Sequence, residues 1–453
     1  MVLILTGCSN STDKYQATGD IVTPEINGKT PEITILAYGE DKFILDCKYL
    51  IEYKNQFEKN YGIRVNYEIL GVGEGSEFGI DNYKKKLTTK LYTKNGPELI
   101  LYDSRSVNLQ SLIQQNAISE VRNNIPNISK IYSNLLNNEV YYVPVGIEYR
   151  PRVMNKKVLD KLKIQEPSLN WTRKDYSEIR KLWLYSGRRP FTRFEYYDIC
   201  DENLSDISLF NKDNHRTNIN TVQMKEAIKN IQNEIFSGNY SLNNEYTYEN
   251  YYNMIFEPQS EEYRDNFSIW NSEEYTRNSL WDISYGSSYN LLRAKNINYA
   301  TASGEMVILP RFSDENSYIE SYGFLVNKNG KNKELAYEFL NGLLSNEIQL
   351  KIYQEDGFLF YPANKEIENT IANIESKEKL DDKAIALKNY VLQMITGGKC
   401  IMDTTVNEKD IALKNMVARD ITKLIFADKK YTDEQISLEL QELDNKYTMW
   451  LNE

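Results

Sequence analysis

The sequence has little histidine, few cysteines and no long apolar run, and each of these shortages excludes a class of protein. Its one histidine, His215, lies in a polar segment, which argues against a Ser-His-Asp triad and against a histidine-rich metal site. The four cysteines form no C-x-x-C pair, so neither a zinc knuckle nor a redox pair is indicated. No stretch approaches about 18 consecutive apolar residues, the length that predicts a membrane-spanning helix.

A positively charged surface is also not indicated. The net charge is −11, whereas a nucleic-acid-binding surface needs clustered positive charge, so no nucleic-acid partner is expected. Hydrophobic residues make up 41% of the chain and charged residues 26%, which is typical of a globular protein. A chain of 453 residues is too long for one ordinary core, and two or three domains are expected.

Tyrosine, by contrast, is abundant, with 35 residues. Rings with an apolar body and a polar tip suit a ligand cleft, although Lys, Asn and Ile are also frequent and compositional bias contributes to the excess. If the Cys8 thiol is modified, Cys47, Cys200 and Cys400 remain; three cysteines cannot all pair, so these are predicted to be buried free thiols.

The chain begins with a short apolar run that leads into Leu5-Thr6-Gly7-Cys8. Small residues before a cysteine resemble the lipobox of bacterial lipoproteins, which implies a diacylglyceryl group on the Cys8 thiol. Two acyl chains hold a protein on a bilayer, where one chain holds it only marginally. The run is short and has no Lys or Arg before it, so we expect the chain to begin inside a signal peptide. The alternative is an ordinary cysteine in a truncated apolar tail.

Strands and helices are predicted to alternate after a flexible polar tether at 9–31. Apolar runs predict strands at 32–38, 64–69 and 98–102, and helical spacing predicts helices between them. This alternation indicates a doubly wound α/β sheet whose sites lie beyond the carboxyl ends of its strands. Further strands are expected at 141–145, 152–155, 306–310 and 323–326, and further helices at 172–185, 224–235, 335–343 and 432–450. Thr172 and Asp175 form a capping-box pattern.

Seven segments are similar, in their order along the chain, to motifs of one known family. They are 96–103, 142–148, 154–157, 170–172, 308–310, 332–340 and 431–435. The chain resembles the extracellular solute-binding proteins of ABC importers, family 1, which are similar to maltose-binding protein. The resemblance covers residues 32–452, although many intervening loops differ, so maltose itself is not implied.

The resemblance implies two doubly wound α/β lobes of the type II periplasmic-binding-protein class, joined by a hinge of several segments. Residues 1–31 would be the residual lipoprotein signal and tether. The N-terminal lobe would comprise 32–148 and 300–327, and the C-terminal lobe 149–299 and 328–453.

The same resemblance implies a binding protein rather than an enzyme, with no cofactor and no metal. Such a protein captures a carbohydrate, here an oligosaccharide, by hinge closure and delivers it to the transmembrane subunits of an ABC permease. A monomer is expected, held by its lipid anchor alone on the outer face of the cytoplasmic membrane of a Gram-positive-type cell.

Ligand-binding residues of the N-terminal lobe are expected in loops that follow strands. The family's Asp-Lys pair falls on Asp41 and Lys42, after Tyr38, although a solvated turn is the alternative. Tyr102 matches a stacking aromatic, and Asp103 and Arg105 are hydrogen-bonding candidates, unless Asp103 only supports a helix cap. Glu148 matches an acidic ligand contact, and its partner is either the ligand or a cross-lobe Arg or Lys.

Aromatic residues supply the remaining candidates. Phe191 opens a ring-rich stretch, 191–197, whose alternative role is lobe core, and Trp270 matches a position beside a strand end near the ligand. Tyr322 and Tyr361 complete the expected set.

Three alternatives remain open from the sequence. One is a lipid-anchored binding protein for a peptide or another solute. A second is a surface glycoside hydrolase, but the adjacent acids Asp381-Asp382 and Glu261-Glu262 do not give the facing geometry that hydrolysis needs. The third is a surface adhesion or sensor protein without transport.

Overall fold

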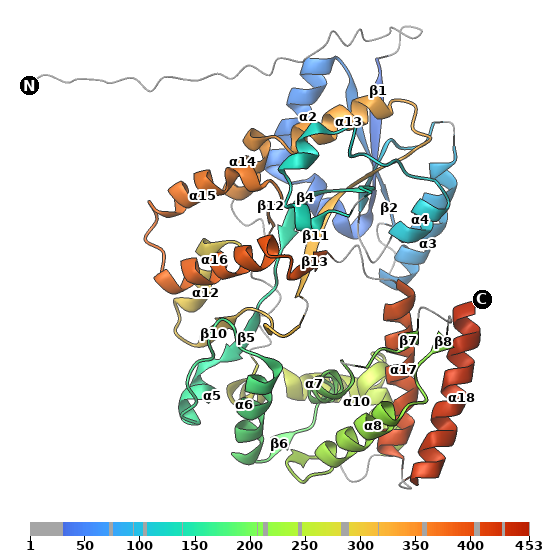
Figure 1. Ribbon diagram of the computed structural model, residues 1–453, viewed down its shortest axis with the longest axis vertical. Helices are drawn as coiled ribbons and strands as arrows, with labels where there is room; N and C mark the ends of the chain where they lie inside the picture. The colour runs from blue at the N-terminus through green and yellow to red at the C-terminus, as the bar shows by residue number, and fades with distance from the viewer. Residues whose placement is uncertain are drawn as a thin grey trace, which may run out of the picture.

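The computed structural model describes most of the chain after the predicted tether. The described residues are 30–71, 76–93, 95–102, 107–137, 139–205, 207–211, 216–242, 247–281, 290–315, 317–355, 360–402, 408–427 and 431–452. They fold into two bodies, of which the first carries the main sheet and the second is mainly helical (Figure 1). Cys8 lies outside the described residues. No described helix has both the length and the apolar content required to cross a membrane.

A seven-stranded mixed sheet forms the centre of the first body. Its strands run in the order β12-β4-β11-β3-β1-β2, and β13 pairs with β11. They are β1 (Glu32–Tyr38), β2 (Arg64–Leu70), β3 (Leu99–Tyr102), β4 (Tyr142–Glu148), β11 (Ser317–Val326), β12 (Tyr361–Pro362) and β13 (Cys400–Met402). The predicted strands at 32–38 and 64–69 are confirmed, and β1 pairs with β2 and β3 in parallel.

Both faces of this sheet are covered. Successive side chains of a strand point to opposite faces, so Ile33 and Ile35 pack into one buried cluster and Leu36 and Tyr38 into another. The covering helices are α1 (Lys42–Leu45), α2 (Lys48–Tyr61), α3 (Ser76–Leu91), α4 (Leu109–Gln114), α12 (Ala294–Thr301), α13 (Lys333–Leu343), α14 (Asn346–Gln354), α15 (Glu368–Glu375) and α16 (Asp382–Thr396). Short 3₁₀ turns lie at η1 (Gly39–Asp41), η2 (Pro126–Lys130), η3 (Ser133–Leu135) and η4 (Lys365–Ile367).

The described residues between 333 and 402 pack against the sheet of the first body, although 328–453 were expected in the C-terminal lobe. Phe339 and Leu343 of α13 share a buried cluster with Ile33 of β1. Val391 of α16 and Met402 of β13 belong to the cluster on the other face of the sheet. The apolar faces of these helices are buried against the strands, so residue contacts rather than chain order decide where this segment lies.

The second body consists mainly of helices, and its strands are fewer than a doubly wound lobe suggests. Three two-stranded sheets are present in the described residues: β5 (Arg152–Asn155) with β10 (Met306–Leu309), β6 (Arg189–Pro190) with β9 (Tyr240–Ser241), and β7 (Phe210–Asn211) with β8 (Arg216–Thr217). The helices are α5 (Lys156–Lys161), α6 (Arg173–Tyr185), α7 (Arg193–Leu204), α8 (Val222–Ile235), α9 (Tyr248–Phe256), α10 (Glu261–Trp270), α11 (Glu273–Asn278), α17 (Glu408–Phe426) and α18 (Asp433–Asn452).

The local signals read from the sequence hold in this body. The predicted capping box at the start of α6 is present, with the Thr172 hydroxyl accepting from the Asp175 amide and the Asp175 carboxylate accepting from Thr172. The stripe of α8 is buried, as predicted, and it packs with α17 and α18 in one core. The chain passes between the bodies from β4 to β5, from α12 to β10 and from β10 to β11, on the side opposite α17 (Figure 1).

Candidate functional site

The edge of the sheet nearest these crossings collects three of the predicted residues. β1 and β3 are parallel, and β3 and β4 are each antiparallel to β11, so β1, β3 and β4 point the same way. Tyr38, Tyr102 and Glu148 are the last residues of these three strands. Because the carboxyl ends of parallel strands share one edge of a sheet, these three residues lie at a common edge. Ligand sites of α/β sheets lie at this edge.

Glu148 lies in a group of two carboxylates and one guanidinium. Register pairs Glu148 of β4 with Glu320 of β11. Arg150 lies between them, with its Nε 3.5 Å from Glu148 Oε1 and its Nη2 2.7 Å from Glu320 Oε2. Glu148 is 2% exposed, and burial raises the pKa of its carboxyl to about 7, with Arg150 lowering it and Glu320 raising it. The partner of Glu148 is therefore an arginine of its own crossing segment rather than a residue across the lobes.

Beside this group, Tyr149 forms hydrogen bonds with three other segments of the chain, at Asn290, Arg311 and Ser317. Its hydroxyl lies 3.0 Å from the Ser317 hydroxyl and accepts the backbone N–H of Arg311 at 3.0 Å. Its own N–H donates to Asn290 Oδ1 at 3.1 Å, and Asn290 Nδ2 donates to Ile147 O at 3.0 Å. The ends of β4, β11 and the segment at 290 are thus fixed together, which sets the position of Glu148.

The predicted aromatic contacts are buried in this conformation. Tyr38 and Tyr102 are 1% and 4% exposed, and Tyr102 packs against Tyr142 with ring centroids 4.8 Å apart. Tyr322 is on the opposite face of the sheet from these two, where its hydroxyl lies 2.6 Å from that of Tyr49. Phe191 packs against Tyr240 and Phe426, and Tyr361 is fully buried in β12. Large rings fill cores well, so abundance of tyrosine alone does not reveal which rings face a ligand.

The polar candidates of the first body are divided between buried and exposed positions. Asp41 ends η1 and is 4% exposed, whereas Lys42 is exposed and forms an ion pair with Asp46 at 3.3 Å. Asp103 and Arg105 lie outside the described residues. The ligand-binding roles of all these residues stay predictions.

The sequence suggested that Trp270 lies beside a strand end, and this prediction is wrong. It is the last residue of α10, half-buried, with its ring 5.3 Å from that of Phe267. The correction has a physical reason, because residues 261–270 follow a Ser260 N-cap that satisfies the Tyr263 amide and starts a helix.

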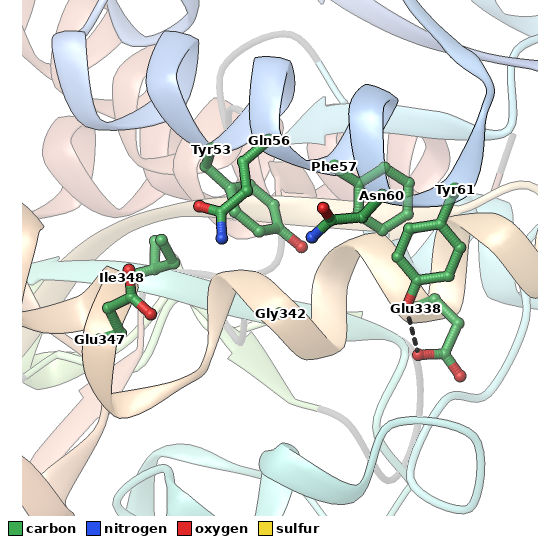
Figure 2. Close-up of a pocket in the computed structure, with 9 residues that line it drawn as sticks. All are labelled: Tyr53, Gln56, Phe57, Asn60, Tyr61, Glu338, Gly342, Glu347 and Ile348. Carbon is green, nitrogen blue, oxygen red and sulfur yellow. Dashed lines mark hydrogen bonds between the residues drawn. The ribbon is translucent and has the colours of Figure 1, made fainter. Parts of the chain in front are cut away.

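A pocket outside this edge lies between α2, α13 and α14 (Figure 2). Its lining includes the rings of Tyr53, Phe57 and Tyr61, with the Tyr61 hydroxyl 3.5 Å from Glu338 Oε2. None of the predicted ligand residues lines it. Gly342 has no side chain, and this leaves room for the Tyr53 hydroxyl to donate a hydrogen bond to Phe339 O at 2.8 Å. The close packing of α2 against α13 at this pocket therefore depends on Gly342.

Metal binding has no support in the described part of the chain, where no group of three or more His, Cys, Asp or Glu side chains is placed to hold an ion. Sequence reasoning missed Tyr149 and Arg150. A signal for Arg150 exists, since a cation two residues beyond a buried carboxylate is within reach of it when the chain stays extended.

Comparison with known families gives one match. Residues 52–382 match the model of a family described as bacterial extracellular solute-binding protein. No curated protein sequence matches the chain at a significant level.

Solved structures resemble the fold over nearly its whole length. One is an ABC substrate-binding protein from Listeria monocytogenes in complex with cycloalternan, at 16% identity and a TM-score of 0.52, covering 94% of this chain and 100% of that chain. Another is a putative oligosaccharide periplasmic-binding protein from Synechococcus sp. MITs9220, at 13% identity and a TM-score of 0.60, covering 92% and 99%. A third is a cyclic alpha-maltosyl-1,6-maltose binding protein from Arthrobacter globiformis, at 13% identity and a TM-score of 0.54, covering 93% and 99%. The likeness confirms the predicted fold class.

Proposed function

The chain belongs to the family of bacterial extracellular solute-binding proteins, a non-enzymatic component of transporters, and from this premise we propose that it captures a carbohydrate for an ABC importer. The ligand would lie between the two lobes, and closure about the crossing segments would enclose it. Ligand contacts with both lobes exist together only in the closed form, so binding shifts the population toward that form.

One observation supports this proposal most strongly. Tyr38, Tyr102 and Glu148 end parallel strands at the edge of the sheet where the chain crosses to the second body. A carboxylate beside Arg150 offers both an acceptor and donors for sugar hydroxyls. Several structures that share the fold were solved with oligosaccharides, among them cycloalternan and maltotetraose, which favours this ligand class.

We assign the lobes by the buried clusters. The first lobe would comprise 32–148, 291–301 and 317–402, because α12 to α16 pack on the seven-stranded sheet or on one another. The second would comprise 152–281, 306–312 and 408–452, most of whose buried residues share the other core, although Val153, Met306 and Ile308 pack into the first. Within the described residues, the chain then crosses between the lobes at 149–151, 302–305 and 313–315.

We further propose that Cys8 carries a diacylglyceryl anchor, so that the body is tethered to the outer face of the membrane and delivers its ligand to a permease. Metabolic labelling with an alkyne fatty acid should label the wild-type chain, and Cys8→Ser should abolish labelling. Equal labelling of both forms would refute the anchor without bearing on ligand binding.

A thermal-shift screen tests the ligand class, because a bound ligand raises the melting temperature by mass action. Mono- and oligosaccharides and short peptides are screened against the purified chain. A shift with at least one oligosaccharide, confirmed by calorimetric titration, is the expected result. A shift with peptides and none with sugars would overturn the carbohydrate assignment.

A further inference from the structure

The ring-rich stretch 191–197 leads to a surface in the second body that holds an unusual cation. Phe191 and Tyr196 point into the core, but Tyr197 is 40% exposed. Between them in the chain, Arg193 is half-buried, and its guanidinium lies 5.5 Å from the centre of the Tyr197 ring and 4.6 Å from that of Tyr263 on α10. The guanidinium is therefore held between two rings by cation–π contacts.

These rings continue along α10. Tyr263 and Phe267 are four residues apart on one helix, so they lie on the same face, and Trp270 packs against Phe267. Phe267 is 45% exposed. We call Arg193, Tyr197, Tyr263, Phe267 and Trp270 the α7–α10 platform. Both helices lie on the side of the second body that faces the first (Figure 1).

Arg193 has no acidic partner in the described chain. Its backbone N–H donates to Asn266 Oδ1 at 3.1 Å, whereas none of the described residues accepts a hydrogen bond from its guanidinium or forms an ion pair with it. Glu195, two residues on, is engaged elsewhere, accepting from the Thr192 amide at 2.9 Å and from the Tyr275 hydroxyl at 2.5 Å. The two ring contacts thus hold the planar guanidinium of Arg193 in place, while its N–H donors have no acceptor among the described residues.

The location of this cation goes against the usual placement of charge. Arg193 is the first residue of α7, where the helix dipole is positive and acidic side chains are favoured. An arginine at a helix start has a local cost that an anionic ligand group would reduce, since guanidinium binds carboxylate through two parallel hydrogen bonds.

The rings define the rest of the ligand. Exposed faces of Tyr197 and Phe267 offer flat apolar surfaces of the kind that meets the C–H face of a sugar ring. The indole N–H of Trp270 is buried and has no acceptor among the described residues, so one donor of the platform is unsatisfied. On the basis of the proposed function, we propose that the α7–α10 platform binds an acidic sugar residue, a uronate, and that Arg193 binds its carboxylate and selects for it.

Matched ligands isolate the carboxylate. Oligomers of galacturonate, of alginate and of hyaluronan are each compared with the same glycan after chemical reduction of its carboxyl groups, together with neutral maltotetraose and cellotetraose. Affinities of the full chain are measured by calorimetric titration. The expected result is that at least one acidic oligomer binds ten-fold or more tightly than its carboxyl-reduced form.

Matched variants isolate the arginine. Arg193→Gln should bring the acidic and reduced forms within about two-fold of each other, and Arg193→Lys should leave an intermediate preference because it keeps the charge and loses the fork. Phe267→Ser should weaken both forms alike. Arg419→Gln is the control, because Arg419 also stacks on a ring, that of Tyr252, but is paired with Glu257 at 2.7 Å. Melting curves establish that each variant folds.

The outcomes separate this inference from the proposed function. Binding of neutral glycans only, or an acidic preference that Arg193→Gln and Arg193→Lys leave unchanged, overturns the inference and leaves carbohydrate capture standing. Absence of binding to every acidic oligomer also overturns it. Peptide binding with no carbohydrate binding overturns the proposed ligand class as well.

Discussion

At the residue scale, burial decides what the charged side chains of this protein can do. Glu148 and Glu320 face each other across two strands and share Arg150, yet one is 2% exposed and the other has a side chain 38% exposed. The buried carboxyl loses hydration that its single guanidinium contact does not replace, so its pKa rises to about 7. A charge at this edge of the sheet is therefore sensitive to pH near neutrality.

Glu148 should make stability depend on pH. Its folded-state pKa of about 7 lies above the ordinary value of 4.5, so folding favours the protonated form. This contribution is complete below pH 4.5 and is lost as the pH rises through 7. Glu148→Gln mimics the protonated form and does not titrate. The difference in urea-unfolding free energy between this variant and wild type should therefore shift in favour of the variant by on the order of 3 kcal/mol between pH 4.5 and 8.

The matched control for that experiment is Glu320→Gln, which removes the more exposed carboxylate of the same group. It should show a smaller change over the same pH range. An unfolding free energy of Glu148→Gln that follows wild type at every pH would contradict the burial argument.

The three described cysteines should be unreactive in the folded protein. Cys47, Cys200 and Cys400 are buried and free, as the sequence predicted, and burial raises the pKa of each thiol to about 12. The thiolate is the reactive form, so at pH 8 it is scarce as well as shielded. In a Cys8→Ser chain, a disulfide reagent should titrate almost no thiol natively and three thiols in denaturant. Rapid native reaction of even one thiol would disprove this expectation.

At the element scale, apolar patterns predict the helices, but close contacts set how they pack. α2 ends where Gly62 adopts a left-handed φ of 63°, a conformation that glycine accepts without strain. Its Tyr53 reaches over α13 to the Phe339 carbonyl only because Gly342 carries no side chain. A pattern of hydrophobic spacing contains no information about such a contact.

Gly342→Ala should destabilise the first body. The added methyl group would lie 2.0 Å from the Tyr53 hydroxyl and 2.8 Å from its ring, so Tyr53 must move and lose its hydrogen bond. Overpacking of this kind costs about 1–3 kcal/mol in urea unfolding. Gly187→Ala is the control, because no heavy atom lies within 4 Å of a methyl group there. Equal stability of both variants would argue against a rigid α2–α13 contact.

At the scale of the whole molecule, two bodies with separate cores are joined by several crossing segments. The buried cluster of α8, α17 and α18 is distinct from the two clusters that flank the sheet. Tyr149, Asn290 and Ser317 fix the crossings at the first body. Relative motion should therefore concentrate between these contacts and the second body rather than within either core.

Closure should be visible in solution. Small-angle scattering of the full chain with a saturating sugar, identified by the thermal-shift screen, should give a smaller radius of gyration than the free chain. Tyr149→Phe keeps the ring and removes the hydroxyl that joins Ser317 and Arg311, so its free form should vary more in radius. An unchanged radius at saturation would count against hinge closure.

Much of the architecture followed from local signals. Alternating apolar runs predicted β1, β2 and the strand at 306–310, and the capping box predicted the start of α6, because these patterns act between residues close in the chain. The order of the motifs along the chain predicted the family, and the match over residues 52–382 confirms it. The candidate site was harder to predict from the sequence. Trp270 ends a helix rather than lying beside a strand end, and Arg193, at the start of α7, was noted only as part of a ring-rich stretch.

By itself, the sequence determined many of the strands and helices, the α/β class and the family, because these depend on periodicity, caps and motif order among neighbouring residues. Only the tertiary structure decided that residues 333–402 return to the first sheet, that Arg150 partners Glu148, and which tyrosines are exposed. These outcomes depend on contacts between residues far apart in the chain. Burial, which fixes the charge state of a carboxylate and the availability of a ring, exists only once those contacts have formed.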